Sequence, residues 1–254
     1  MEILQKTKEK ISFAEEMDES LANAIRRSAL EIPVLAINDV EFYKNDSVLY
    51  DEVLALRLGL LPLKTEKMSS QEECSCKGKG CSKCSVQLKL KASGPTTVYS
   101  KDLKGKADVV YEDMPIVKLG EGQSLEFVAT AALGKGIKHT KFSPGLVFYR
   151  NAAEISVENC EKCEECIKAC PQNLLKAEKN KIEFNSNISR YKCDLCDACV
   201  DACKKFGKNA IKILPGKEIV FFIESWGQIE AEDVLIEAVK ALKENLKQVE
   251  KEAK

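Results

Sequence analysis

Twelve cysteines are the residues of this sequence with the clearest chemistry. They fall into three groups of four, and neighbouring cysteines within a group are separated by one to four residues. Thiols at such short spacing favour binding of a metal ion or an iron–sulfur cluster in a reducing compartment, whereas an exported chain would use them for disulfides. The pattern therefore predicts metal chemistry rather than a disulfide framework.

Eight of the cysteines form an internal repeat. Its halves read CEKCEECIKACP and CDLCDACVDACK, and the second follows the first by 33 residues. Three cysteines that are two residues apart let one tight loop bind three corners of an iron–sulfur cube. Two zinc sites are the alternative, because zinc also accepts four thiolates, but zinc sites generally use two separated cysteine pairs. We therefore expect the repeat to bind [4Fe–4S] clusters.

Residues 158–210, which contain this repeat, resemble bacterial-type two-cluster ferredoxins. In that family the fourth cysteine of each half binds the cluster of the other half. Lys204 stands where the family usually has proline, but proline is not a ligand and the expected ligation is unchanged. The resemblance implies two clusters, the first held by Cys160, Cys163, Cys166 and Cys203, and the second by Cys193, Cys196, Cys199 and Cys170.

The third group of cysteines lies in the segment CSCKGKGCSKC, on a loop rich in glycine and lysine. Cys74 and Cys76 precede the turn, and Cys81 and Cys84 follow it. Two such pairs suit a closed, tetrahedral structural zinc site. Disulfides, a single iron–sulfur centre and free thiols are the alternatives. We predict one Zn²⁺ here, with no histidine ligand, because His139 is the only histidine in the chain.

Composition narrows the class of protein. The chain has 254 residues, 44% of them hydrophobic, which suffices for a sizeable core and two or three domains. Its 39 basic and 40 acidic residues give no basic excess, so strong direct binding of nucleic acid is not expected. No apolar run approaches the roughly 18 residues that a membrane span needs. The N-terminal sequence MEILQKTKEKISF lacks a secretory apolar stretch, so we expect a cytoplasmic protein without membrane contact.

The elements that position these groups are expected to be mixed α and β. A helix is predicted from an N-cap at Ser20 to a point before Pro33, and a second over residues 51–59. Alternating apolar residues predict half-buried strands at 86–92, ended by Gly94-Pro95, and at 125–131. Residues 219–223 form a further strand candidate, and Gly227 separates it from a long terminal helix.

Two of the predicted helices carry an apolar stripe. The stripe of the first consists of Leu21, Ile25, Ala29 and Ile32, with Arg26 and Arg27 outside it. The terminal helix has a near-heptad stripe opposite a face of lysine and glutamate, made of Leu235, Ala238, Val239, Leu242, Leu246 and Val249. Periodicity alone fits core packing within the chain and a seam with another helix equally well.

The segment SLANAIRRSALEIPVLAINDVEFYKNDSVLYDEVLALRLGLLPL, residues 20–63, closely resembles the D-type subunit of archaeal DNA-directed RNA polymerase. It is also similar to the third-largest subunit of eukaryotic RNA polymerase II and to the N-terminal domain of the bacterial α subunit. Further similarity covers GKGIKHTKFSPG and the ending ESWGQIEAEDVLIEAVKALKENL. The motif residues are Asn23, Ala24, Arg26 and Arg27, followed by Arg57, Leu58, Gly59 and Pro62.

The resemblance implies an α+β fold with three parts. Residues 1–45 and 211–254 would form a discontinuous α-subunit-like dimerisation domain. Residues 46–157 would form an inserted mixed α/β domain that carries the four-cysteine loop at 74–84. Residues 158–210 would form an inserted ferredoxin-like domain.

The resemblance also implies a role without catalysis. The chain would pair with the small subunit L and dock onto the second-largest and other core subunits of the polymerase. The expected contacts are Leu21, Ile25, Arg26, Arg27, Ala29, His139, Leu235, Leu242 and Leu246. Without the resemblance, Arg26 and Arg27 would be interpreted as a solvated helix face and His139 as a structural histidine.

No arrangement of residues typical of a catalytic site is evident, because paired carboxylates, a Ser–His–Asp set and a phosphate-binding loop are all missing from the sequence. The main alternative function is a ferredoxin-type electron-transfer protein or oxidoreductase subunit. A DNA-binding role for the ferredoxin-like domain is weaker, because the charges are evenly balanced.

Overall fold

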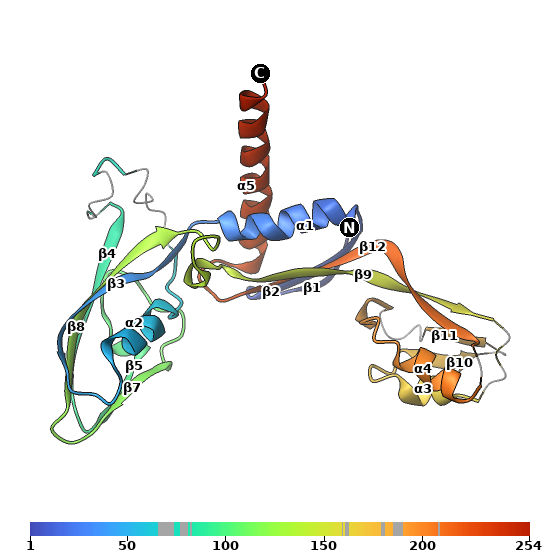
Figure 1. The fold of residues 1–254 in the computed structure, drawn as a ribbon, viewed down its shortest axis with the longest axis horizontal. Helices are drawn as coiled ribbons and strands as arrows, with labels where there is room; N and C mark the ends of the chain where they lie inside the picture. The colour runs from blue at the N-terminus through green and yellow to red at the C-terminus, as the bar shows by residue number, and fades with distance from the viewer. Residues whose placement is uncertain are drawn as a thin grey trace. The chain divides into compact units, whose positions relative to one another are not determined.

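The computed structural model describes residues 1–65, 74–76, 81, 83–158, 160, 163–178, 181–184, 190–207 and 209–254. They form two compact units. The first consists of Met1–Lys6, Ser12–Asn23 and Phe148–Phe222, and the second of Thr7–Ile11, Ala24–Val147 and Ile223–Lys254. Helices and strands occur in both units, which confirms the predicted α+β class (Figure 1).

The main sheet of the second unit has the strand order β3-β8-β4-β6 (Figure 1). The strands pair antiparallel and span Val34–Asn45, Ser124–Gly134, Ser85–Ser93 and Lys104–Gly105, respectively. Alternate residues of β8, from Leu125 to Ala131, are at most 1% exposed, and Leu88 and Leu90 of β4 are buried as well. The half-buried strands predicted at 125–131 and 86–92 are therefore confirmed.

Helix α2 (Asp51–Gly59) contributes to the core of this unit. It has the predicted bounds, and Leu54 and Leu58 are fully buried in the same hydrophobic cluster as Ile37 and Phe127. The unit also contains the antiparallel pair β5 (Thr96–Tyr99) and β7 (Pro115–Leu119), with the short turns η2 (Ser100–Asp102) and η3 (Thr140–Phe142).

The first predicted helix is α1 (Glu19–Ser28), followed by the 3-10 turn η1 (Ala29–Glu31). The predicted N-cap at Ser20 is wrong. The Ala22 N–H donates to the Asp18 carbonyl at 3.0 Å, so Asp18 takes the position that opens the helix. The helix therefore begins at Glu19, two residues earlier than a cap at Ser20 would give.

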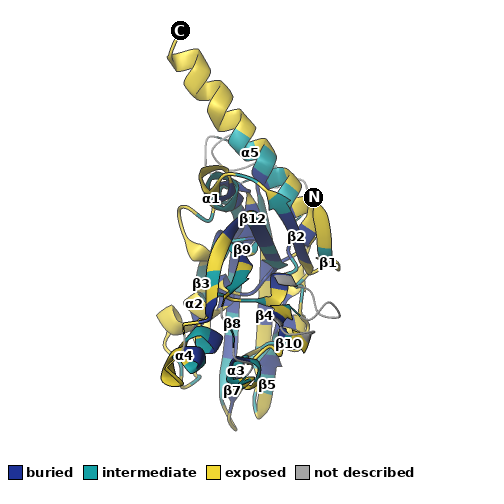
Figure 2. Ribbon diagram, turned by 90° about the vertical axis from the view of Figure 1, so that its right-hand side faces the viewer, coloured by how far each residue is buried: buried dark blue, intermediate teal, exposed yellow. Residues whose placement is uncertain are grey.

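The predicted terminal helix is confirmed as α5 (Ala231–Glu252). Its start packs against η1, and Val234 and Ala238 are buried. Figure 2 shows that burial on α5 is confined to its first half, whereas the outer turns are exposed.

The first unit is built on a sheet with the order β1-β2-β12-β9. These strands span Glu2–Lys6, Lys10–Glu16, Ile211–Ser225 and Gly145–Val157, so the strand predicted at 219–223 is part of the longer β12. Aromatic stacking joins neighbouring strands, with ring centroids 5.5 Å apart for Phe13 and Phe221 and 4.7 Å apart for Phe148 and Phe222.

The cysteine repeat forms a small lobe of the first unit, between β9 and β12 in the chain. It contains α3 (Glu165–Ala169), the antiparallel pair β10 (Leu175–Glu178) and β11 (Lys181–Phe184), η4 (Arg190–Lys192) and α4 (Ala198–Lys205). Leu175 and Ile182 are buried in its core together with Ile211 of β12 and the thiols of Cys166 and Cys199. Across the described ranges, no helix has the length and apolar character needed to cross a bilayer.

Candidate cluster and metal sites, and surfaces for partners

Two loops, here named the first and second ligand loops, carry the first three cysteines of each half, at 160–166 and 193–199. They share a backbone conformation. Glu164 and Asp197 have left-handed φ values of 60° and 57°, and each immediately precedes its helix, α3 or α4. Non-glycine residues rarely adopt this conformation, because it costs roughly 1 kcal/mol. Its recurrence at matching positions shows that the sequence repeat is also a structural repeat. Loops of this kind form concavities of backbone N–H groups that suit anionic groups.

One set of thiols surrounds Cys166. Burial raises the pKa of the Cys166 thiol, and the nearby Cys160, Cys163 and Cys203 raise it further. Charge interactions of this kind weaken with distance, so Cys160, Cys163 and Cys203 are each near enough to Cys166 to act on its thiol. Cys166 and Cys203 are buried, and Cys160 and Cys163 are partly exposed. The structure thus brings together three cysteines of the first half and the last cysteine of the second half.

The other set surrounds Cys199. Burial raises the pKa of the Cys199 thiol to about 11, with contributions from Cys170 and Cys193. Burial also raises the pKa of Cys193, and Cys196 and Cys170 add to the effect. All four thiols of this set line one hollow, together with apolar groups that include Leu174 and Ile213.

The chemistry of both sets fits an iron–sulfur cluster. Each set offers four thiols, and burial raises the pKa of Cys166 in the first set and of Cys193 and Cys199 in the second, which disfavours these thiolates without a positive partner. Iron ions supply that positive charge and bind thiolates directly. The Leu174 N–H also donates to the Cys170 sulfur at 3.4 Å, a kind of bond that tunes such clusters.

The four-cysteine loop brings its thiols together at zinc-like separations. All four sulfur atoms lie within 4.8 Å of one another. Sulfur pairs are separated by 3.6 Å for Cys74 and Cys81, 3.5 Å for Cys76 and Cys84, and 3.9 Å for Cys81 and Cys84. A tetrahedral zinc ion with Zn–S bonds of about 2.3 Å places its sulfur ligands about 3.8 Å apart. The four donors therefore fit this ion.

Charge supports the same interpretation of the loop. The Cys81 N–H lowers the pKa of the Cys84 thiol, but burial and the three neighbouring thiols outweigh it and raise this pKa to about 12. A divalent cation would reverse this balance, because it stabilises thiolates. The glycine- and lysine-rich turn at 77–80, between the two cysteine pairs, lies outside the described residues.

The apolar stripe of α5 is covered at its start and exposed at its end. Leu235 and Leu242 are partly exposed, whereas Leu246 and Val249 are 60% and 63% exposed. Isolated exposed apolar residues are common on protein surfaces, but a helical stripe of them is typical of an interface.

The expected contacts on α1 and η1 differ in exposure. Leu21 is 47% exposed, Ile25 is partly exposed, and Ala29 is buried within the chain. Arg26 is partly exposed and already has an interaction within the chain, whereas Arg27 is exposed. The guanidinium of Arg27 and the side chain of Leu21 are the groups of this set that are most open to a partner.

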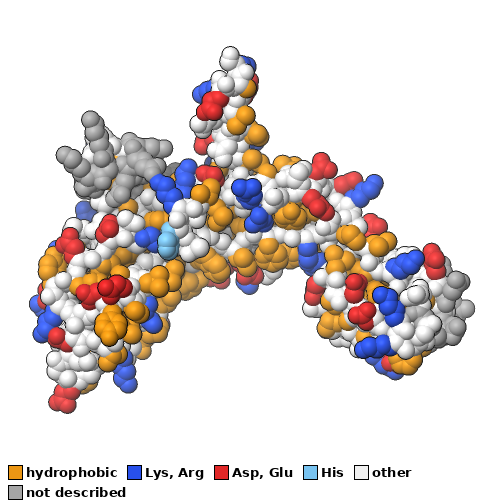
Figure 3. All heavy atoms as spheres, viewed as in Figure 1, with side chains coloured by type: hydrophobic (Ala, Val, Ile, Leu, Met, Phe, Trp, Pro, Cys, Tyr) orange, Lys and Arg blue, Asp and Glu red, His pale blue; other side chains and the backbone are white. Residues whose placement is uncertain are grey.

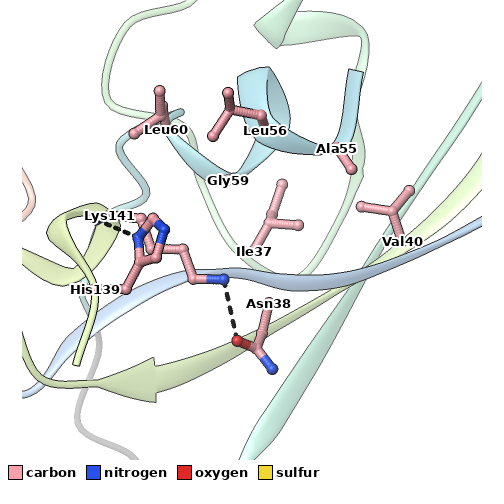
Figure 4. Close-up of a pocket in the computed structure, with 9 residues that line it drawn as sticks. All are labelled: Ile37, Asn38, Val40, Ala55, Leu56, Gly59, Leu60, His139 and Lys141. Carbon is pink, nitrogen blue, oxygen red and sulfur yellow. Dashed lines mark hydrogen bonds between the residues drawn. The ribbon is translucent and has the colours of Figure 1, made fainter. Parts of the chain in front are cut away.

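His139 lies at a pocket of about 200 Å³ in the second unit (Figure 4). Its Nδ1 accepts a hydrogen bond from the Lys141 N–H at 3.1 Å, and the Lys141 Nζ donates to Asn38 Oδ1 at 3.1 Å. The apolar part of the lining comes from β3, from α2 with Leu56, and from Leu60 directly after α2. Figure 3 shows the imidazole on the surface, next to basic side chains and an apolar area.

Sequence reasoning missed Arg150 of β9 and the sheet residues that contact the cysteine lobe. Ile155 of β9 and Ile213 of β12 pack against its core. Arg150 donates hydrogen bonds to two backbone carbonyls just before the second ligand loop and within its first cysteine. Ile155 and Ile213 lie outside the cysteine motif, and no local pattern marks Arg150.

Comparison with known protein families gives two matches. Residues 36–145 match the family described as RNA polymerase Rpb3/RpoA insert domain. Residues 159–208 match the family described as 4Fe-4S dicluster domain. The second match and the grouped thiols together support iron–sulfur binding by the cysteine lobe.

Whole-chain relatives extend this similarity over nearly the full length. The DNA-directed RNA polymerase subunit Rpo3 of Archaeoglobus fulgidus is 36% identical, covering 99% of this chain and 96% of its own. The subunit of the same name from Methanothermobacter thermautotrophicus is 39% identical, covering 89% and 88%. That from Methanosarcina mazei is 38% identical, covering 88% and 86%. The chain therefore belongs to the Rpo3 family of archaeal DNA-directed RNA polymerase subunits.

Proposed function

We propose that this chain is an assembly subunit of RNA polymerase that pairs with the small subunit L, docks the second-largest and other core subunits, and contributes no catalytic residue. The exposed apolar end of α5 supports this most directly, because the family places the chain in a multi-subunit enzyme and this stripe lacks cover within the described part of the chain. A cytoplasmic location fits the many reduced cysteines.

We assign the α5 stripe to the L interface. Burial of an exposed leucine or valine side chain contributes about 1.5–3 kcal/mol, so Leu246 and Val249 together suffice to change the affinity strongly. Leu235 and Leu242 extend the same face toward the covered part of the helix. Leu21, Ile25 and Ala29 form the second expected stripe, in which the buried Ala29 acts by packing η1 rather than by direct contact.

We assign the His139 pocket and the arginines of α1 to docking of the large subunits. Leu56 of α2 and Leu60, which directly follows this helix, are 57% and 53% exposed, although the other face of α2 is core. A helix that is apolar on both faces is typical of one that is covered in a larger assembly. Lys141 adds a half-buried positive charge to the pocket, and burial lowers its pKa, so an acidic group of a partner would be favoured there.

We further propose the cofactors, their cysteine ligands and the domain boundaries that the sequence predicts. Two [4Fe–4S] clusters would be held by the sets around Cys166 and Cys199, and one Zn²⁺ by the loop at 74–84. The dimerisation domain would comprise residues 1–45 and 211–254, the inserted domain residues 46–157, and the ferredoxin-like domain residues 158–210. The clusters would stabilise the lobe or adjust assembly to redox conditions, since ligation exists only in the folded state.

The L interface is tested by a charge placed in the stripe. The double variant Leu246→Glu with Val249→Glu should raise the Kd for subunit L at least about 100-fold in titration calorimetry, because two buried contacts are lost. The control is Gln248→Glu, which puts one of the two added charges on an exposed position of the same turn and should stay within about threefold of the unchanged chain. Equal affinities for the double variant and the control would refute the assignment.

Electron transfer is the second candidate function, favoured by the match to the dicluster family. It requires a redox enzyme as the partner and rapid, reversible reduction of the clusters. An oxidoreductase bound in stoichiometric amount in place of polymerase subunits would support it.

A further inference from the structure

The two ligand loops are attached to the first unit in different ways. β9 leads along the backbone into the first loop, and the Glu158 N–H donates to the Ala210 carbonyl at 2.8 Å. This backbone hydrogen bond joins the segment before the first loop to the segment just before β12. The second loop follows η4, and the side chains of Arg150 and Tyr191 attach it to the sheet.

Arg150 of β9 is the central group of this attachment. Its Nη1 donates to the Cys193 carbonyl, and its Nη2 donates to the Tyr191 carbonyl at 2.5 Å. The planar guanidinium presents its N–H groups as a fixed fork, which lets one side chain bind two carbonyls at once. One of these carbonyls belongs to the first cysteine of the second loop.

The guanidinium itself is held firmly in place. It lies over the Phe222 ring, 5.2 Å from the centroid, and Phe222 stacks on Phe148. Burial lowers the pKa of Arg150, and the nearby Asp194 opposes this, so the charge is partly withdrawn from water. A fork that is fixed on a sheet can hold a loop more rigidly than an exposed, freely rotating side chain.

Tyr191 continues the same attachment. Its ring is buried against Ala14, Ala152 and Val220 of the sheet. Its hydroxyl lies 3.2 Å from carboxylate oxygens of both Glu2 and Glu218. Tyr191, two residues before Cys193, is therefore held on the sheet in two ways. Its carbonyl accepts from Arg150, and its side chain packs against the sheet.

We propose that Arg150 is a positioning residue for the second ligand loop, so that the cluster held by Cys193, Cys196, Cys199 and Cys170 is retained through a side chain of the sheet. This inference rests on the proposed binding of a cluster by the second ligand loop. It makes the two halves of the repeat unequal, although their cysteine spacing is the same. Arg150 also adds a positive charge beside one cluster, and net charge is among the factors that set the reduction potential.

The test uses the full chain, loaded with iron and sulfide without oxygen. Iron and sulfide analysis of the unchanged chain examines the two-cluster proposal by itself, with about eight iron atoms expected per chain. Cluster loss to an iron chelator is then followed by visible absorbance in the unchanged chain, Arg150→Gln, Arg150→Lys and the control Lys212→Gln. Lys212 is an exposed residue of β12, and the control removes the same charge without removing the fork.

Arg150→Gln should lose half of the cluster absorbance at least about tenfold faster, while the other half decays at the rate of the unchanged chain. Arg150→Lys keeps the charge but not the fork, so it should also lose one cluster faster. Redox titration separates the two effects, because Arg150→Gln should lower one midpoint potential and Arg150→Lys should leave both unchanged. Lys212→Gln should match the unchanged chain in loss rate and in both potentials.

Equal loss rates in all four proteins would overturn the inference, as would faster loss of both clusters in parallel. If far-UV circular dichroism shows that Arg150→Gln does not fold, the rates of cluster loss from Arg150→Lys are compared with those of the unchanged chain instead. Equal rates, or faster loss of both clusters, would then overturn the inference. An iron content of four with tenfold faster loss in the Arg150 variants would refute the two-cluster proposal and leave the positioning role intact.

Discussion

At the scale of single residues, the metal chemistry of the chain depends on where its thiols lie relative to one another. The four sulfur atoms of the 74–84 loop lie within 4.8 Å, and the repeat gathers its thiols around Cys166 and Cys199. The first group belongs to the second unit and the repeat to the first unit. We therefore expect the 74–84 loop and the repeat to respond separately to substitution.

Cys81→Ser tests this separation. A structural zinc site needs four ligands for a closed tetrahedral shell, so the dialysed variant should retain well under one zinc atom per chain, against about one in the unchanged chain. Its iron and sulfide content should be unchanged. Elemental analysis by plasma mass spectrometry is applied to the unchanged chain, to Cys81→Ser and to Ser82→Ala, which is the control for a substitution in the same loop. Undiminished zinc in Cys81→Ser would contradict the assignment.

The left-handed residues of the ligand loops give a second prediction at this scale. Asp197 is exposed and has a φ of 57°, a conformation that glycine adopts without steric cost. Asp197→Gly should therefore stabilise the loaded lobe by about 0.5–1 kcal/mol. Asp201→Gly, the same change within α4, should destabilise it by a similar amount. The midpoint of urea-induced cluster loss measures both, and shifts of the same sign would contradict this account of the loop.

At the scale of elements, the cysteine lobe has a small core that includes two of its cysteines. Its buried members are Leu175, Ile182 and Ile211, with the thiols of Cys166 and Cys199. The second unit has a far larger cluster around β3, β8, β4 and α2. Because ligation contributes folding free energy only in the native state, the lobe should depend on iron and the second unit should not.

Removal of iron tests this dependence. In hydrogen exchange, α3, α4 and the β10–β11 pair should lose protection by at least about 100-fold in the iron-free chain, since their few apolar contacts cannot replace the ligand bonds. The ends of β9 and β12 that pack on the lobe should lose part of theirs. The amides of β8, which pair on both sides, serve as the internal control and should change less than about threefold. Equal protection with and without iron would show that the lobe folds by itself.

The same elements show how far sequence reasoning reaches. The bounds of α2 followed from local signals, namely acidic residues at its start and Gly59 with Pro62 at its end. The strands at 86–92 and 125–131 followed from alternation of apolar residues. The role of Arg150 could not be predicted in this way, because its carbonyl partners lie 41 and 43 residues further along the chain.

The start of α1 shows a different limit. Ser20 and Asp18 are both good capping residues, and the backbone bond from Ala22 to Asp18 decides between them. Similarly, the stripe of Leu21, Ile25 and Ala29 appeared continuous, but packing against α5 covers Ala29 and leaves Leu21 exposed. Helical periodicity identifies a face, whereas tertiary packing determines which part of it stays open.

At the scale of the whole molecule, family membership and exposed apolar surface point in the same direction. The relatives match the chain over nearly its full length, with the cysteine lobe included. Leu246 and Val249 on the outer turns of α5, and Val53 and Leu56 on α2, are apolar and exposed. An electron carrier that worked alone would not require either exposed apolar surface. An assembly subunit needs at least two such surfaces, one for each partner that it joins.

Affinity purification of the tagged native chain from its own cells, without oxygen, tests the central claim most directly. The assembly account predicts that the large polymerase subunits and a small L-type subunit elute with it in near-stoichiometric amounts, and that mass spectrometry identifies them in one complex. Elution of the chain as a free monomer, or with an oxidoreductase and no polymerase subunit, would contradict the account.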